Sequence, residues 1–208
     1  MSFLTAESPE FTLEIKRSEF ICQIKHVETE DRAKDFIAER KKLHSLATHN
    51  CYAYRVNDCG VERSRYSDDG EPQGTAGLPI LNVLKNKEFV NVVAVVTRYF
   101  GGIKLGGGGL VRAYSEACAG AAAIAAVSEC VPCAEFRIEF SYENYKKFSA
   151  FRLPEKSVIR STEYSDKVTV ILAVDSSLVD SFVTEFEGFY CKRQSISRLS
   201  DVLISFDK

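Results

Sequence analysis

Apolar and polar positions alternate along the first part of the chain, from residue 11 to residue 27. The apolar residues share one face on either side of Arg17, which predicts a β-hairpin that turns at that residue. Over residues 29–44 the apolar spacing becomes helical, with acidic residues early and basic residues late. Thr29 is the expected N-cap of this helix.

A nearly continuous β-branched run covers residues 92–97. Such a run is typical of a central strand buried on both faces, although a buried helix has the same apolar density. Before it, residues 51–56 predict a short strand, and residues 78–86 predict a short buried helix with Pro79 near its first turn.

Small residues dominate the segment after this strand. The helical spacing of apolar residues from Leu110 to Ile124 predicts a helix whose many alanines allow close packing on a sheet. We expect Pro132 to end this helical region.

The composition changes near residue 133, from small apolar residues to a mixture of aromatic and charged residues. We therefore predict two domains, residues 1–133 and 134–208. In the second domain the patterns predict strands at 136–140, 157–164 and 167–174, a last strand through Ile196, and helices near 143–152 and 177–187. This βαββαβ order is the signature of a ferredoxin-like sandwich, so the predicted fold class is α+β.

The overall composition excludes some classes of protein. The chain has 208 residues, is 45% hydrophobic and carries a net charge of −2, so no bulk field attracts nucleic acid or a membrane. No apolar stretch is long enough to span a bilayer, and the first residues lack the features of a secretory signal. We expect a cytoplasmic protein without a membrane partner.

The segment RYFGGIKLGGGGLVRAY, residues 98–114, holds six glycines within nine positions. At the start of a helix, free N–H groups and the positive end of the helix dipole form a site for an anion. No acidic residue lies between Glu88 and Glu116, so the basic residues of this interval would reinforce the site. The candidate anion or nucleic-acid site comprises Arg98, Tyr99, Gly101, Gly102, Lys104, Gly106, Gly107, Gly108, Gly109 and Arg112.

Other interpretations of this segment stay open. Neither the Walker A motif nor the dinucleotide-binding fingerprint fits its glycine spacing, and a purely structural loop is the alternative to an anion site. Tyr99 and Phe100 would stack on bases beside the loop, or else pack in the core or at a sheet edge.

The segment SRYSDDGEPQGTAGLP, residues 64–79, is a second polar loop. Its candidate site residues are Ser67, Asp68, Asp69, Gly70, Glu71, Gly74 and Thr75. Asp68, Asp69 and Glu71 are carboxylates of the kind that Mg²⁺ accepts, but two aspartates before a glycine also form Asx turns. We expect no metal and no cofactor, with Mg²⁺ as the alternative. The sequence identifies no catalytic nucleophile or base.

The segments SDDGEPQGTAGLP and RYFGGIKLGGGGLVRAY resemble the paired signatures of the Impact/YigZ family, and the resemblance extends over essentially the whole chain. It implies an N-terminal domain similar to the second domain of ribosomal protein S5. The C-terminal domain would be ferredoxin-like, similar to the last domain of elongation factor G. The family's eukaryotic namesake acts on a pathway that restrains translation initiation, through protein contacts. The length indicates the bacterial type, without the additional N-terminal partner-binding domain of the eukaryotic relatives. The family has no established catalytic residues.

These observations predict a protein that binds RNA or a ribosomal surface and modulates translation, with a phosphate held at the glycine-rich helix start. Two alternatives remain. One is a Mg²⁺-dependent enzyme that acts on a phosphate ester or nucleotide between the two loops. The other is a protein-interaction module that binds a protein partner without nucleic acid.

Overall fold

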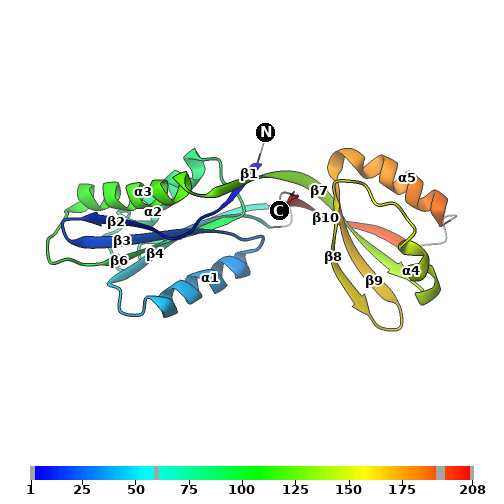
Figure 1. Ribbon diagram of the computed structural model, residues 1–208, viewed down its shortest axis with the longest axis horizontal. Coiled ribbons are helices and arrows are strands. Elements are labelled where there is room, and N and C mark those ends of the chain that lie inside the picture. The colour runs from blue at the N-terminus through cyan, green and yellow to red at the C-terminus, as the bar shows by residue number, and fades with distance from the viewer. Residues whose placement is uncertain (1–2, 59–60, 191–194, 207–208) are drawn as a thin grey trace. The chain divides into compact units, whose positions relative to one another are not determined.

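The computed structural model describes residues 3–58, 61–190 and 195–206 (Figure 1). The chain forms two compact units that divide after Glu129. This division and the boundary predicted after residue 133 both fall within one strand, β7 (Ala126–Phe140). The predicted α+β fold with two domains is confirmed.

The first unit is built on an antiparallel sheet in the order β2-β3-β6-β4-β5. Helix α1 lies on one face of this sheet, and α2 and α3 lie on the other (Figure 1). The strands are β2 (Phe11–Ile15), β3 (Ser18–His26), β4 (His49–Asp58), β5 (Val61–Ser67) and β6 (Val92–Tyr99). The helices are α1 (Glu30–Leu43), α2 (Gly77–Asn86) and α3 (Gly107–Ala123).

The central strand of this sheet is β6, as its β-branched run predicts. Its side chains alternate between two cores, because Val92, Ala94 and Val96 pack with α2 and α3 while Val93 and Val95 pack with α1. Pairing with β3 on one side and β4 on the other satisfies its backbone. The last residues of β6 lead directly into the glycine-rich segment.

Two local predictions are confirmed in this unit. Strands β2 and β3 form the expected hairpin, with Lys16 and Arg17 at positive φ (48° and 65°) in its turn. Thr29 caps α1, because its hydroxyl accepts a hydrogen bond from the Arg32 N–H at 3.2 Å.

The prediction that Pro132 ends the helical region is wrong. Helix α3 ends at Ala123, and Pro132 lies inside β7, paired with Leu203 of β10. Proline is tolerated there because β9 pairs with β7 only from Cys133 onward, so the missing N–H interrupts no bond of that ladder.

Several strands are longer than predicted or were not predicted. Strand β7, expected at residues 136–140, begins ten residues earlier at Ala126, because β1 and β10 pair with its first part. The strand expected at residues 51–56 runs from His49 to Asp58 and pairs with β5, which was not predicted. Strand β1 (Phe3–Glu7) was also not predicted, and it pairs with β7.

The second unit has the predicted βαββαβ order. Its sheet is antiparallel in the order β8-β9-β7-β10, with the two helices packed on one face over an aromatic core. After β7 its elements are α4 (Tyr142–Phe148), β8 (Ser157–Tyr164), β9 (Val168–Asp175), α5 (Val179–Phe189) and β10 (Ser195–Ser205). Helix α4 is shorter than predicted, and the last strand continues well past Ile196 because it pairs along the whole second half of β7. No helix among the described residues combines the length and apolar character needed to cross a membrane.

Candidate functional site

Helix α3 begins without a capping side chain. Its N-cap residue, Gly106, has φ 74° and ψ 166°, a backbone conformation that essentially only glycine adopts. The first hydrogen bond of the helix runs from the Leu110 N–H to the Gly106 carbonyl at 2.9 Å. The N–H groups of Gly107, Gly108 and Gly109 precede this bond and receive no side-chain cap. Three backbone donors are therefore available at the positive end of the helix dipole.

Local geometry explains part of the glycine content. A Cβ at Gly101 would lie 2.0 Å from the carbonyl oxygen of Arg17, and Gly102 has φ +86°. A Cβ at Gly109 would lie 3.0 Å from the Cβ of Leu105. At these positions a side chain would strain the fold.

Gly107 and Gly108 have no such requirement. Neither has a positive φ, and a Cβ at Gly108 would meet no atom within 4 Å. A Cβ at Gly107 would meet only the Thr75 methyl group, at 3.9 Å. Glycine at these two exposed positions keeps the first turn of α3 accessible, and the approach of Thr75 brings the two loops together.

The basic residues near the loop fall into two groups. Lys104 and Arg112 are exposed and make no hydrogen bond or ion pair with any described residue. Arg98 is 5% exposed and donates through Nη1 to Glu71 Oε1 at 2.6 Å. Only Lys104 and Arg112 are therefore available to a ligand, whereas Arg98 is part of the interior.

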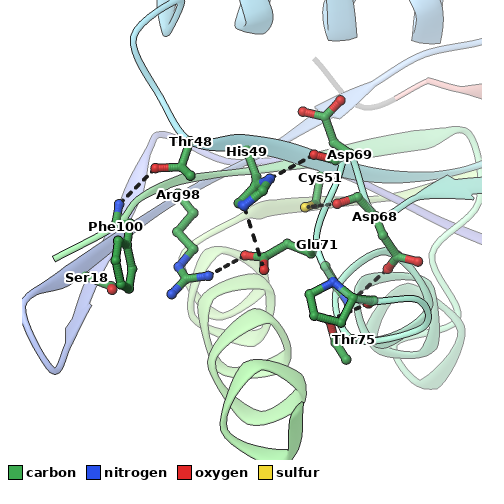
Figure 2. Close-up of polar contacts among 12 residues, drawn as sticks. Ser18, Thr48, His49, Cys51, Asp68, Asp69, Glu71, Thr75, Arg98 and Phe100 are labelled. Atoms are coloured by element: carbon green, nitrogen blue, oxygen red, sulfur yellow. Dashed lines mark hydrogen bonds and ion pairs between the residues drawn. The ribbon is translucent and has the colours of Figure 1, made fainter. Parts of the chain in front are cut away.

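The Arg98–Glu71 pair joins the two loops (Figure 2). The Arg98 guanidinium lies between the rings of Phe20 and Phe100, 5.4 and 5.3 Å from their centroids. Tyr114 of α3 donates its hydroxyl proton to the same Glu71 oxygen at 2.8 Å. The two segments thus meet around a buried carboxylate that receives donors from β6 and from α3.

The aromatic residues at the end of β6 differ in their surroundings. The Tyr99 hydroxyl forms a 3.0 Å hydrogen bond with His44 Nδ1 and is held at the C-terminus of α1. Phe100 is 46% exposed, and its backbone N–H donates to Thr48 Oγ1 at 3.1 Å. Of the two rings, Phe100 is the exposed one, with the Arg98 guanidinium over one of its faces.

Asp68 organises the second loop. Its carboxylate accepts hydrogen bonds from the N–H groups of Gly74, Ala76 and Gly77 at 2.8, 3.0 and 2.8 Å. It thereby supplies acceptors at the start of α2, where Ala76, the N-cap residue, offers no side-chain oxygen. Asp68 acts within this loop as a helix cap.

The rest of the loop is held by bonds within the protein. Asp69 accepts from Lys41 Nζ at 2.6 Å and from the Asn50 N–H at 2.7 Å. Burial alone would raise the pKa of Asp69, but these two hydrogen bonds hold that pKa below its usual value. Ser67 Oγ accepts from the Asp69 N–H, and Thr75 Oγ1 donates to the Pro72 carbonyl. Glycines 70 and 74 have φ +89° and +75°, as their turns require.

These contacts bear on the candidate Mg²⁺ ligands. Asp68, Asp69 and Glu71 each accept hydrogen bonds from different groups of the protein, so a metal would have to displace those donors. Among the residues that the structure describes, no three His, Cys, Asp or Glu side chains come together as a metal-binding group.

His49 and Cys51 show how the loop is fixed to β4. His49 Nδ1 donates to the Asp69 carbonyl at 2.8 Å, which leaves Nε2 facing Glu71 Oε2 at 3.8 Å (Figure 2). Cys51 Sγ donates to the Asp68 carbonyl at 2.9 Å. Burial raises the pKa of the Cys51 thiol to about 12, so this thiol is not a nucleophile near neutral pH.

Tyr114 is the member of this cluster that the sequence pattern did not identify as polar. Its spacing placed it on the buried face of a helix, and it is fully buried. A buried tyrosine hydroxyl requires a hydrogen-bond partner. A tyrosine on the buried face of a helix therefore indicates that a polar group lies opposite it.

Comparison with known proteins gives consistent results. Residues 16–122 match the model of the Impact N-terminal domain. Over 114 residues the chain is 50% identical to IMPACT family member YvyE of Bacillus subtilis (strain 168), an alignment that covers 55% of this chain but only 52% of that relative's length. It is 33% identical over 176 residues to an IMPACT family member of Haemophilus influenzae, covering 84% of this chain and 85% of that protein. A crystal structure of a hypothetical protein superimposes with a TM-score of 0.74 at 30% identity, covering 96% of this chain and 98% of that one.

Proposed function

Because this chain belongs to the IMPACT family, we propose that it modulates translation by binding RNA or a ribosomal surface, with a phosphate held at the first turn of α3. The family resemblance implies domains similar to parts of ribosomal protein S5 and elongation factor G, and this expectation favours the ribosome as the setting. The geometry of the glycine-rich segment supplies the binding chemistry.

The observation that carries this proposal is the uncapped start of α3. Gly107 and Gly108 expose their N–H groups, although the fold itself would accept a side chain at either position. Backbone donors at a helix N-terminus bind phosphate oxygens without reading the base sequence. We therefore propose a contact with the nucleic-acid backbone.

The charges around this turn support the same conclusion. Lys104 and Arg112 flank it, and neither is neutralised by a described carboxylate. Phe100 presents an exposed ring at the other end of the loop, where an unpaired base would stack. A protein site for single-stranded RNA is expected to combine donors to phosphate, cations and an aromatic ring.

The test is salt-dependent binding of the full chain to purified ribosomes and to a mixed RNA pool. The variant Lys104→Glu/Arg112→Glu should bind at least about tenfold more weakly at low salt, and the slope of log K against log salt should fall by roughly one for each lost phosphate contact. The control Lys85→Glu/Lys87→Glu makes the same change of charge on exposed residues at the C-terminal end of α2 and should bind like the wild type.

Two outcomes would contradict the proposal. Absence of binding by the wild type to both ribosomes and RNA would exclude the nucleic-acid role. Equal losses in the test and control variants would show that net charge, and not the start of α3, governs binding. An in vitro translation assay with the same three proteins then tests the modulation itself, and only the test variant should lose its effect.

A further inference from the structure

A groove lies between α4 and β8 in the second unit, away from the residues described above. Its volume is about 460 Å³. The residues that line it include Tyr145, Lys146, Phe148, Phe151, Leu153 and Ile159. This groove is contained within one unit and has no role in the proposed phosphate site.

The floor of the groove is an aromatic row. Tyr145, Phe148 and Phe151 follow one another at a spacing of three, and successive rings stack with centroids 6.3 and 6.4 Å apart. Phe148 and Phe151 are only 6% and 9% exposed. Their faces are thus covered by packing, and the groove offers ring edges and aliphatic walls.

The wall of the groove contains an exposed apolar side chain. Ile159, on β8, is 42% exposed although it lines the same groove as Leu153. β8 is the last strand of its sheet and pairs only with β9 among the described residues. Nothing in the described part of this unit covers Ile159, although burial would remove apolar surface from water.

The rim of the groove is basic. Lys146 is the one charged residue that lines it, and Arg152 follows Phe151 directly. Both side chains are exposed and make no hydrogen bond or ion pair with a described residue. From residue 146 to residue 160 the sequence holds five basic residues and one acidic residue, in a chain whose net charge is −2. Two of the five, Lys147 and Arg160, pair with Glu143 and Glu135, so Lys146 and Arg152 are the cations that the groove offers to a partner.

We propose that this groove binds an acidic segment of a partner protein, which inserts one or two bulky apolar side chains against Phe151, Leu153 and Ile159. Lys146 and Arg152 would pair with its carboxylates at the rim. A protein segment fits better than RNA, because the aromatic faces are already covered and leave no stacking platform for a base. An apolar anchor inside a charged rim is the usual organisation of a protein interface.

The experiment is selection of a random peptide library, displayed on phage, against the full-length protein. We expect enriched peptides that combine acidic residues with Leu, Ile or Phe. The best peptide, synthesised with a fluorescent label, should bind roughly tenfold more weakly to Ile159→Glu, which places a charge in the apolar wall. Lys146→Glu/Arg152→Glu should also weaken binding, and the loss should be larger at low salt than at high salt, because salt screens the charges at the rim.

Matched controls separate the groove from general effects. Leu199→Glu changes an exposed apolar residue of β10 in the same unit, and Lys85→Glu/Lys87→Glu repeats the charge change in the other unit; both should bind the peptide like the wild type. Ile159→Ala, which shortens the apolar side chain without adding a charge, should also weaken binding. The proposal is overturned if no peptide is enriched or if the enriched peptides are basic. It is also overturned if labelled RNA competes with the peptide and is weakened by the same substitutions.

Discussion

Residues 67–77 and 100–109 are both turn-rich, glycine-containing segments that lead into a helix, and they treat the helix start in opposite ways. In the first, the Asp68 carboxylate accepts three backbone N–H groups at the beginning of α2. In the second, the N–H groups of the first turn of α3 receive no side-chain cap. A helix start without a side-chain cap is less stable than a capped one, and the N–H groups of its first turn remain open to water or to a ligand.

The same contrast appears in the charges. The acids of the first segment are bound to groups of the protein, and Glu71 reaches across to Arg98 and Tyr114. The cations at the second segment, Lys104 within it and Arg112 in the helix that follows, have no described partner. The acidic loop is therefore architectural, and our proposal gives the recognition role to the glycine-rich loop.

The largest expected effect comes from removing the carboxylate that joins the two loops. Glu71→Ala would leave the Arg98 cation buried without its counter-ion and the Tyr114 hydroxyl without its acceptor. The expected loss in the free energy of unfolding is about 3–5 kcal/mol, measured by urea denaturation. The double variant Glu71→Leu/Arg98→Met should recover most of this loss, because it removes both charges together.

A small loss in Glu71→Ala, below about 1 kcal/mol, would mean that water reaches the pair and solvates Arg98. The cluster would then be accessible to a ligand, and the division between an architectural loop and a recognition loop would fail.

The parts of the fold that the sequence predicts are those fixed by neighbours in the chain. The β2–β3 hairpin, α1 and the buried strand β6 each follow from a local period or cap. Strand β5 lacks an apolar period, since five of its seven residues are exposed, and its strand conformation comes from pairing with β4. Pro132 was misread for the same reason, because its place in β7 depends on partners far away in the sequence.

The candidate site was predicted in part. The start of α3 was identified from two local signals, the glycine content and the absence of acidic residues. The sequence did not indicate that Arg98 would be buried against Glu71, 27 residues away, and so differ from Lys104 and Arg112. That difference depends on the tertiary meeting of two loops, which no spacing rule describes.

The next prediction separates the two kinds of glycine within one loop. Gly106→Ala forces a side chain into a backbone conformation that only glycine adopts readily, and should cost roughly 1–3 kcal/mol of stability. Gly108→Ala meets no atom within 4 Å and should stabilise the helix by up to about 1 kcal/mol. If the exposed N–H groups bind phosphate, Gly108→Ala should nevertheless bind ribosomes or RNA more weakly.

Both properties are measured on the same three proteins, by urea denaturation and by ribosome binding at low salt. A Gly108→Ala variant that is more stable and binds as tightly as the wild type would assign the glycines to architecture alone. The comparison between the two loops would then lose its main support.

The smallest effect concerns pH and the acidic loop. The hydrogen bonds from Lys41 and the Asn50 N–H lower the pKa of Asp69 in the folded protein below the value of 3.8 for an unperturbed carboxyl. A lowered folded-state pKa contributes stability that is fully present well above pH 3.8 and is lost as the pH falls below 3.8 through the folded-state pKa. Asp69→Asn should therefore be destabilised relative to the wild type at pH 7 and less so at pH 3, measured by urea denaturation at both.

The difference in stability should shrink in high salt, because the Asp69 side chain is 27% exposed and its pairing with Lys41 is screened. An equal difference at the two pH values would show that the carboxylate charge of Asp69 is not what stabilises the loop.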